Sequence, residues 1–512
     1  MTNTIHYSAE RCAAGKSYSQ RERIVTTPGL HILAVDRREM IEQTIRNLRD
    51  QADKAGTTPF IRAIFSSEGK FAGGSANVRV DIEALPTIYS TGHVVIVTTH
   101  TALQISDLSK FAGWRCYIDE TPSAFLRETL KTPALGSAWF AARYDLIPDP
   151  AGRAFSTVRP REGAPTNKSV RSDTAIRSLE NFHSRVTAYV EADEKKGRKE
   201  ADHNPVYVDL TTWDDMDTDG LEWTWHSLWL PTALSAFDRI EVVGNAFLES
   251  ITYMIWLNRC GMAEDGQAPK VVFTPLPVLP ARPFAVRPVE IRYFAEGHTC
   301  STTFLDSDQG RANLALAVDY LCETDDTGQF VNVDPSAHIW MTNTKRQSSL
   351  AAIPGLMLQP QQSGSNSYAS FTHATMLYSA KPSPSEISIF ESMNITADQA
   401  TRARETETLI QFANRIGRQA DDTRKLTITV YDRRQAEDLQ AYFDSVGHFS
   451  TGLVLIDLGF ADVVRRKPGR PKKVKPVLTP AQLEQAAIEK REKDRIRQQK
   501  SRANRAKEAE PA

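Results

Sequence analysis

A short Ala-Gly-Lys-Ser stretch near the N-terminus carries residue types that bind phosphate. Ala14, Gly15, Lys16 and Ser17 match the end of the pattern G-x-x-x-x-G-K-[ST], whose first glycine is replaced by Glu10. The stretch follows a strand-like TIHYS and opens a helical KSYSQRERIV, so backbone N–H groups and a helix dipole would face a bound phosphate. The alternative is an ordinary turn between a strand and a helix. The pattern indicates a nucleotide site if further groups of the same chemistry accompany it.

Two adjacent carboxylates end an apolar stretch further along the chain. The run WRCYIDETPSA, residues 114 to 124, reads as a strand that closes on Asp119 and Glu120. Hydrolysis of a magnesium nucleotide needs one carboxylate that holds the metal through water and one that orients and deprotonates the attacking water. Such a pair is also common in structural contexts. Together with the Gly-Lys-Ser stretch, it favours an ATPase site.

A third motif lies far downstream. The stretch QFANRIGR, residues 411 to 418, matches Q-x-x-G-R-x-G-R at each specified position except the first glycine, which is Asn414. Arg415 and Arg418 are three residues apart and are expected on one face of a helix. From there their guanidinium groups could reach the γ-phosphate and stabilise the charge of the transition state. A surface basic helix would not explain why Gln411, the second glycine and both arginines fall in register.

In this order the three motifs resemble those of the superfamily 2 helicases and translocases, over residues 1 to 460. The resemblance implies two tandem RecA-like P-loop NTPase domains with ATP and Mg²⁺ bound in the cleft between them. The short, divergent motifs are also similar to those of phage and plasmid helicases of the origin-binding type. The resemblance implies these roles: Lys16 contacts the β- and γ-phosphates, Ser17 ligates magnesium, Asp119 binds the metal through water, Glu120 is the general base, Gln411 positions the γ-phosphate or the attacking water, and Arg415 and Arg418 are arginine fingers.

Other segments resemble the family's remaining motifs. LAVDRREMIEQ and VTTHTAL resemble motif Ia and the following strand-end motif, which touch the nucleic-acid backbone, and Arg37, Thr99 and His100 are the candidates. For His100 a hydrogen-bonded loop histidine is the other interpretation. VVGNAFLES, residues 242 to 250, stands in place of the coupling motif, usually Ser-Ala-Thr, and departs from it. WMTNTK and GSNSYASFTHATML resemble motifs IV and V, with three candidate contacts: Gly364, Asn366 and Tyr368.

The order of strand-like and helical segments predicts an α/β protein with mostly parallel sheets. Strand-like runs occur at residues 31–36, 93–99, 115–119, 239–244, 337–343 and 425–432, and a helical pattern follows the first of them. Residues 150 to 204 are loop-like and then charged and helical, which indicates an insertion in the first domain. The Pro-rich run at residues 274–288 reads as a linker. The expected domains are residues 1–275, 286–460 and a tail, 463–512.

The tail differs from the rest in charge. From residue 463 to 512 there are 16 Lys and Arg against 6 Asp and Glu, a net charge of +10, whereas the whole chain has −1 and the remainder therefore −11. Its start resembles an AT-hook, in which a Gly-Arg-Pro core enters an A·T minor groove. The alternatives are an electrostatic tether and a nuclear-import-like basic run. From Thr479 onward the sequence predicts a helix that forms on an anionic partner. The expected DNA contacts are Arg465, Arg466, Lys467, Arg470, Lys472 and Lys473.

Composition fits a globular ATPase without a membrane segment. The 512 residues are 41% hydrophobic and 24% charged, and the five cysteines have no metal-binding spacing. No apolar run suits a bilayer span, and no signal pattern is visible, so a cytoplasmic location is expected. The leading hypothesis is an ATP-dependent DNA helicase or translocase of a phage or mobile element, with DNA and other replication proteins as partners. The alternatives are a non-hydrolysing DNA-binding scaffold and an RNA-directed ATPase.

Overall fold

The computed structural model describes residues 2–8, 10, 14–66, 77–131, 140, 142–153, 155–174, 176–194, 205–209, 222–262, 268–280, 285–360, 367–417, 419 and 421–460. Residues 1–461 form one compact unit and residues 462–512 a second. The second unit lies outside the described residues, and with it the whole predicted DNA-binding tail. The described part contains no helix that combines the length and apolar character of a membrane span.

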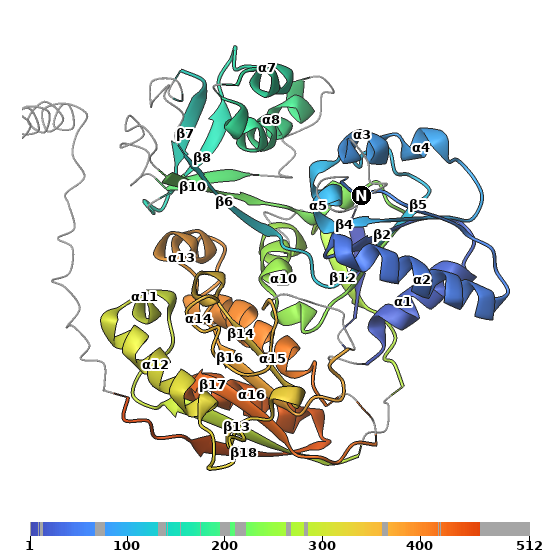
Figure 1. Ribbon diagram of the computed structural model, residues 1–512. Helices are drawn as coiled ribbons and strands as arrows, with labels where there is room; N and C mark the ends of the chain where they lie inside the picture. Colours follow the sequence, from blue (N-terminus) through green and yellow to red (C-terminus); the bar gives the residue numbers. More distant parts are fainter. Residues whose placement is uncertain are drawn as a thin grey trace, which may run out of the picture. The chain divides into compact units, whose positions relative to one another are not determined.

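A seven-stranded parallel sheet forms the N-terminal domain (Figure 1). Its order is β12-β1-β11-β5-β2-β4-β3, so β11 lies between β1 and β5. The inner strands β2, β4 and β5 read as buried apolar runs because helices cover both faces, as all six residues of β2 illustrate. The strands are β1 (Asn3–Tyr7), β2 (Leu30–Val35), β3 (Phe60–Ala63), β4 (Val94–Thr99), β5 (Trp114–Asp119), β11 (Arg239–Val243) and β12 (Val271–Pro275).

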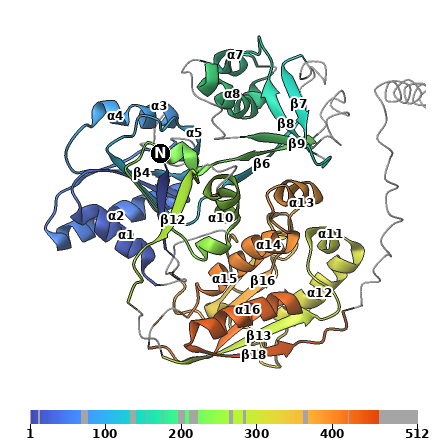
Figure 2. The same ribbon diagram turned by 180° about the vertical axis from the view of Figure 1, so that it is seen from behind.

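The helices of this domain divide between the two faces of the sheet (Figures 1 and 2). One buried cluster joins α1 (Lys16–Thr26) and α2 (Arg38–Ala55) to one face. Helix α2 ends where Gly56 takes a left-handed φ of 68°. The other face carries α3 (Val78–Glu83), α4 (Leu85–Ile88), α5 (His100–Ile105) and α10 (Ile251–Trp256).

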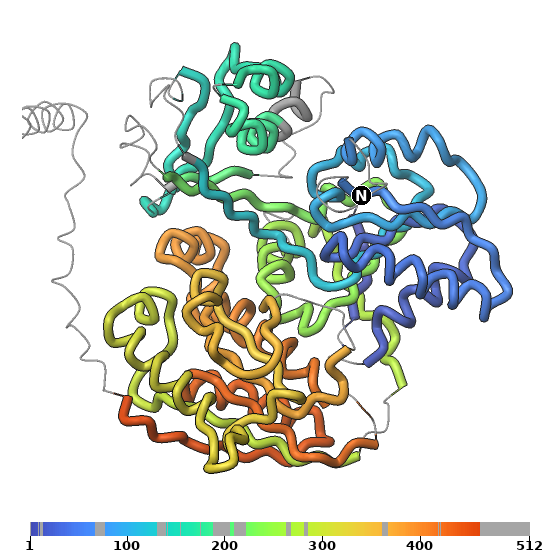
Figure 3. Tube along the Cα trace, in the orientation of Figure 1, coloured from blue at the N-terminus to red at the C-terminus, as the bar shows by residue number. Residues whose placement is uncertain are grey.

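A five-stranded antiparallel sheet interrupts the domain between β5 and β11, and Figure 3 traces the chain out of the parallel sheet and back. Its order is β6-β10-β9-β8-β7. The predicted insertion at residues 150–204 covers only part of this subdomain, because the strands β6, β7, β9 and β10 lie outside that range. Its elements are β6 (Phe125–Lys131), β7 (Tyr144–Pro148), β8 (Phe155–Pro160), β9 (Val206–Asp209), β10 (Glu222–Leu228), α7 (Asn167–Ser172) and α8 (Glu180–Glu194).

The C-terminal domain is a six-stranded parallel sheet in the order β15-β14-β16-β17-β13-β18. One face packs on α11 (Thr302–Leu305) and α12 (Asp308–Cys322), and the other on α15 (Glu407–Ala413) and α16 (Arg433–Val446). The remaining elements are β13 (Arg287–Ala295), β14 (His338–Thr342), β15 (Leu356–Met357), β16 (His373–Leu377), β17 (Leu426–Asp432), β18 (Phe449–Leu455), α13 (Pro384–Glu391) and α14 (Ala397–Thr401).

Short 3-10 or π-helical segments connect several of these elements. They are η1 (Arg177–Leu179), η2 (Pro231–Leu234), η3 (Phe247–Glu249), η4 (Leu257–Gly261), η5 (Pro335–Ala337), η6 (Thr344–Arg346) and η7 (Arg402–Thr406). The predicted α/β class is confirmed: two parallel-sheet domains follow one another, as expected for two tandem RecA-like domains. Each of the six strand-like runs named from the sequence falls on a strand of one of the two parallel sheets.

Candidate nucleotide-binding site

The phosphate-loop residues lie at the carboxyl edge of the N-terminal sheet, where ligands of open α/β sheets bind. Gly15 is the N-cap of α1 with a φ of 88°, a left-handed conformation that strains any residue with a side chain. Lys16 opens the helix, and its Nζ donates to the carbonyl oxygen of Glu10 at 2.7 Å. Glu10 itself accepts a hydrogen bond from the Leu279 backbone N–H at 3.0 Å, so its carboxylate ties the loop to the segment after β12.

Ser17 and Asp119 meet directly. The Ser17 Oγ donates to Asp119 Oδ1 at 2.6 Å, and Arg21 Nη1 lies 3.9 Å from Asp119 Oδ2. Burial raises the pKa of Asp119, while the Ser17 hydrogen bond and Arg21 oppose that shift. A hydroxyl and a carboxylate side by side are the protein oxygens that Mg²⁺ takes together with water and phosphate oxygens. No cluster of three or more His, Cys, Asp or Glu able to hold a metal occurs in the described part of the chain. The donor set therefore fits a magnesium ion that a nucleotide helps to hold.

Glu120 occupies a strained backbone position. Its φ is 69°, in the left-handed region, and its N–H donates to the carbonyl oxygen of Val243 at 2.9 Å. Outliers of this kind persist where the surrounding structure enforces them, often at functional sites. Burial, followed by the charge of Asp119, raises the pKa of Glu120 to about 8, and Glu407 adds to the shift while Lys16 opposes it. The carboxyl group therefore has the proton affinity of a base near neutral pH.

Gly244 and Asn245 directly follow β11, the strand that lies between β1 and β5 in the sheet. A Cβ atom on Gly244 would lie 2.0 Å from the Oγ1 of Thr121, so glycine is required for the ends of β5 and β11 to approach. The Asn245 side chain is 7% exposed, and its Nδ2 donates to both carboxylate oxygens of Glu407, at 2.8 and 3.1 Å. This hydrogen bond joins the N-terminal domain to α15 of the C-terminal domain.

Sequence reasoning missed Asn245 and Glu407. Asn245 was not a candidate residue and was noted only within VVGNAFLES, the stretch that departs from the coupling motif. Glu407 was not a candidate residue either. The signal for Glu407 is its spacing: it lies four residues before Gln411, one helical turn away, and Gln411 Nε2 donates to Glu407 Oε1 at 2.8 Å. Burial raises the pKa of Glu407 to about 7, although Asn245, Gln411 and Lys16 oppose the shift.

The predicted arginine pair is only partly described. Arg418 lies outside the described residues. Helix α15 ends at Ala413 because Asn414 leaves the helical conformation with a ψ of 3°, so the prediction that Arg415 stands on a helix face is wrong. The Arg415 side chain is 4% exposed, its guanidinium lies 5.0 Å from the Phe412 ring, and Nη1 is 3.5 Å from the carbonyl oxygen of Gln359. In this structure Arg415 is held within the C-terminal domain, and its role as an arginine finger stays a prediction.

The candidate nucleic-acid residues have local roles. Arg37 Nε lies 3.2 Å from Asp36 Oδ2, and the Thr99 hydroxyl caps α5 by accepting from the Ala102 N–H at 3.3 Å. His100 is 6% exposed with Nε2 2.9 Å from the Asp119 carbonyl oxygen, and burial lowers its pKa. Of its two interpretations, the hydrogen-bonded histidine is the one that this burial supports.

Of the motif V candidates, only Tyr368 is described, and its ring packs against Phe371 at 5.6 Å between centroids. Gly364 and Asn366 lie outside the described residues. So do the tail residues Arg465, Arg466, Lys467, Arg470, Lys472 and Lys473.

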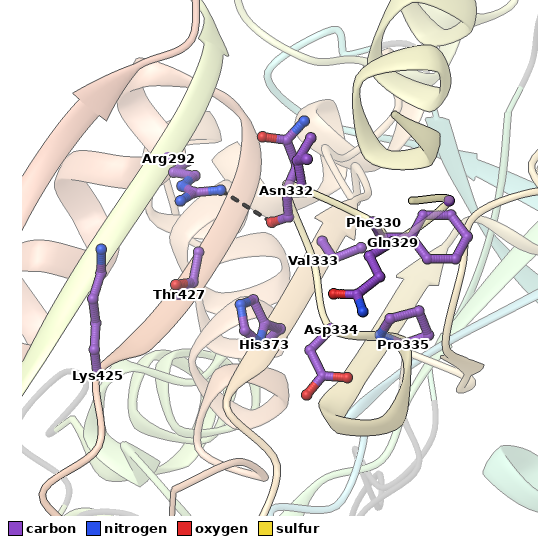
Figure 4. Close-up of a pocket in the computed structure, with 12 residues that line it drawn as sticks. Arg292, Gln329, Phe330, Asn332, Val333, Asp334, Pro335, His373, Lys425 and Thr427 are labelled. Carbon is purple, nitrogen blue, oxygen red and sulfur yellow. Dashed lines mark hydrogen bonds between the residues drawn. The ribbon is translucent and has the colours of Figure 1, made fainter. Parts of the chain in front are cut away.

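A separate hollow of about 710 Å³ lies on the C-terminal sheet (Figure 4). Arg292 and His373 line it from β13 and β16, Lys425 lines it from the segment before β17, and residues 328–335 line it from the loop before β14. Both cations already have a partner, because Arg292 Nε and Lys425 Nζ donate to the two oxygens of Glu290 at 2.7 and 2.6 Å. None of the predicted site residues lines this hollow.

No protein-family model matches the sequence, and no curated protein does. Three solved structures illustrate the similarities found. Xpd4 of S. tokodaii is 11% identical over 88% of this chain and 96% of its own, with a TM-score of 0.38. S. cerevisiae Dbp5 bound to RNA and ADP BeF3 is 9% identical over 89% and 85%, with a TM-score of 0.35. The DUF1998 helicase MrfA bound to DNA and AMPPNP is 10% identical over 88% and 50%, with a TM-score of 0.30. The site of this chain is therefore defined by its own strand order and side chains.

Proposed function

We propose that this protein is an ATP-dependent DNA helicase or translocase of the superfamily 2 type. The observation that carries the proposal is the meeting of Lys16, Ser17, Asp119 and Glu120 at one sheet edge, with Glu407 hydrogen-bonded there from the second domain. A purely structural carboxylate pair would not explain a serine of a phosphate loop, a magnesium-type donor pair and a base with a raised pKa in the same place. The functional units proposed are residues 1–275, 286–460 and 463–512.

The residues divide the chemistry among them. The N-terminal turn of α1 and Gly15 present backbone N–H groups to the phosphates, and Lys16 exchanges its bond to the Glu10 carbonyl for phosphate oxygens. Ser17 and Asp119 would hold Mg²⁺, which supplies positive charge against the triphosphate. Glu120 accepts the proton of the attacking water, and Arg415 and Arg418 are the proposed cations from the second domain. A cycle of domain closure and reopening would convert hydrolysis into movement along DNA.

The preference for DNA over RNA rests on the tail. Its net charge of +10 and the Gly-Arg-Pro core suit a duplex with a narrow minor groove. Arg37 and Thr99 are the proposed contacts on the N-terminal domain, and replication proteins are the proposed further partners. RNA-directed hydrolysis and a non-hydrolysing DNA-binding scaffold are the competing outcomes of the experiment below.

The test measures ATP hydrolysis by the full chain alone and with single-stranded DNA, duplex DNA or RNA. Lys16→Ala removes the phosphate contact, and truncation after Asp462 removes the tail. DNA-stimulated turnover that disappears in Lys16→Ala supports the proposal, and a truncated protein that loses stimulation at raised salt identifies the tail as a tether. Stimulation by RNA alone would support an RNA-directed ATPase instead. DNA binding that depends on the tail, without ATP hydrolysis, would support a non-hydrolysing DNA-binding scaffold instead.

A further inference from the structure

Asn245 lies at the end of the strand next to the one that precedes the proposed general base, Glu120. It follows β11, whose Val243 accepts the hydrogen bond from the Glu120 N–H at 2.9 Å. Val243 is also the register partner of Asp119 across the parallel pair. Because Gly244 leaves no room for a side chain against Thr121, the two strand ends are in direct contact. Asn245 therefore leaves the sheet at the same edge and next to the same strand as Glu120.

The two ends of the Asn245 amide have different surroundings. Nδ2 donates to both oxygens of Glu407, whereas the buried Oδ1 accepts no hydrogen bond from the described residues. Because Nδ2 donates to Glu407, the amide is held with Nδ2 toward that carboxyl group and Oδ1 away from it. A buried carbonyl oxygen without a donor costs free energy. It marks a position for a donor that the described protein groups do not supply.

The reactants of hydrolysis identify that donor. Triphosphate oxygens are acceptors, and a second acceptor would repel them. The attacking water is the reactant that has two O–H groups, one for Glu120 and one for a carbonyl oxygen. The charge of Glu407 adds to the raised pKa of Glu120, and Lys16 opposes the raised pKa of Glu407, so the Asn245–Glu407 pair is close enough to interact with both groups.

Resting on the proposed ATPase function, we infer that Asn245 Oδ1 accepts a hydrogen bond from the attacking water. Glu407, held in turn by Gln411, is the positioning residue that keeps the Asn245 amide in the required orientation. The water gives its other proton to the Glu120 carboxylate as its oxygen bonds to the γ-phosphorus, and ADP leaves with the electron pair of the broken bond. Since Glu407 belongs to the second domain, the water is aligned only while the two domains are in contact.

The kinetic test compares Glu407→Gln, Asn245→Ala and the control Glu391→Gln, an exposed glutamate at the end of α13. A glutamine can donate to Asn245 and allows its amide to turn, so we expect kcat for ATP to fall on the order of tenfold or more in both site variants, with KM within about twofold. A merely structural role would change KM as well, so a fall in kcat with KM unchanged is the result that a positioning role predicts.

A second readout needs no nucleotide. Hydrogen–deuterium exchange is measured along the backbone of α15 in wild type and in Asn245→Ala, and loss of the tie should raise exchange in α15 although the substitution lies in the other domain. Unchanged exchange there would overturn the contact. A wild-type kcat in both site variants, in a protein that Lys16→Ala inactivates, would overturn the inference and leave the ATPase standing. A wild-type chain without any turnover would overturn both.

Discussion

Ser17 and Asp119 are 102 residues apart in the sequence, and the Ser17 Oγ donates to Asp119 Oδ1 at 2.6 Å. The bond requires β1 and β5 to end at the same edge with β11 between them. It places a hydroxyl and a carboxylate side by side, and both are oxygen donors of the kind that bind Mg²⁺.

Replacement of Ser17 by alanine should weaken the use of Mg²⁺ more than the binding of nucleotide. We expect the Mg²⁺ concentration for half-maximal ATPase to rise on the order of tenfold, because one oxygen ligand is lost while Lys16 is kept. Titration of the ATPase rate with Mg²⁺ measures this. Thr26→Ala, at the exposed end of the same helix, is the control and should match wild type. Equal Mg²⁺ dependence in the two variants would contradict a ligand role for Ser17.

Glu120→Gln should abolish proton acceptance without loss of nucleotide affinity. We expect kcat to fall on the order of 100-fold or more, as is usual for removal of a general base. In wild type the rate of hydrolysis should rise with pH as Glu120 ionises near its raised pKa of about 8. A residual rate in Glu120→Gln that no longer rises over this range confirms the assignment. A variant that keeps the wild-type profile would show that another group takes the proton.

The same two carboxyl groups predict how stability depends on pH. The pKa values of Glu120 and Glu407 are raised from their ordinary 4.5 to about 8 and about 7. The folded chain therefore binds more protons than the unfolded chain, so this contribution to stability is full below the ordinary pKa and is lost as pH rises through 7 to 8. Glu120→Gln should gain in Tm relative to wild type as pH rises from about 4.5 to about 8. Thermal melts across this range, with Glu391→Gln as a control that stays parallel to wild type, measure the difference.

Gly244→Ala should disturb the contact between β5 and β11. The added Cβ would lie 2.0 Å from Thr121 Oγ1 and 2.8 Å from the Thr121 backbone nitrogen, so a side-chain rotation alone does not relieve it. We expect a loss of about 1–3 kcal/mol in the free energy of unfolding, as for other overpacked sites, and a loss of ATPase beyond it. Gly452→Ala is the matched control because nothing lies within 4 Å of its Cβ position. Equal Tm values in denaturation of the two variants would contradict the close approach.

Arg23→Met should loosen the helix that carries Lys16. Arg23 Nε and Nη2 donate to Oε2 of the fully buried Glu241 on β11, at 3.1 and 2.7 Å, and Arg239 holds the other oxygen. Loss of one charged partner should cost about 1.5–3 kcal/mol. Arg46→Met is the control, because its partner Glu42 is 3.9 Å away and both side chains are largely exposed. Chemical denaturation that finds no difference between the variants would show that Arg239 alone is sufficient.

Local patterns in the sequence predicted most of the parallel sheets. The strands β2, β4 and β5 are continuous apolar runs, and α2 has an apolar stripe that ends at a glycine. The antiparallel subdomain was underestimated because its charged helix and loops mark residues 150–204, whereas β6 and β10 carry mixed sequences that read equally as other elements. Pairing between strands that are distant in the sequence leaves no local mark.

The candidate site divides in the same way. Lys16, Ser17, Asp119 and Glu120 sit in motifs whose residue types alone suggest phosphate and metal chemistry. The spacing of Glu407 to Gln411 indicates only a shared helix face. What distinguishes Glu407 is a hydrogen bond to a residue 162 positions away in another domain, which the sequence does not show. The helix end before Arg415 was missed because the intervening Asn414 is tolerated in a helix, and only its backbone angle shows the break.

The position of β1 in the sheet also constrains the biosynthesis of this protein. Ile5 pairs with Ile240 on one side and with Phe273 on the other, so both neighbours of the first strand are encoded far behind it. At ordinary translation speeds these partners leave the ribosome on the order of ten seconds or more after β1. During that interval the nascent phosphate loop has no sheet to anchor it, and the antiparallel subdomain is made first. A fragment that stops before Arg239 would contain every residue of the phosphate loop and both carboxylates but not the strands that bring them together.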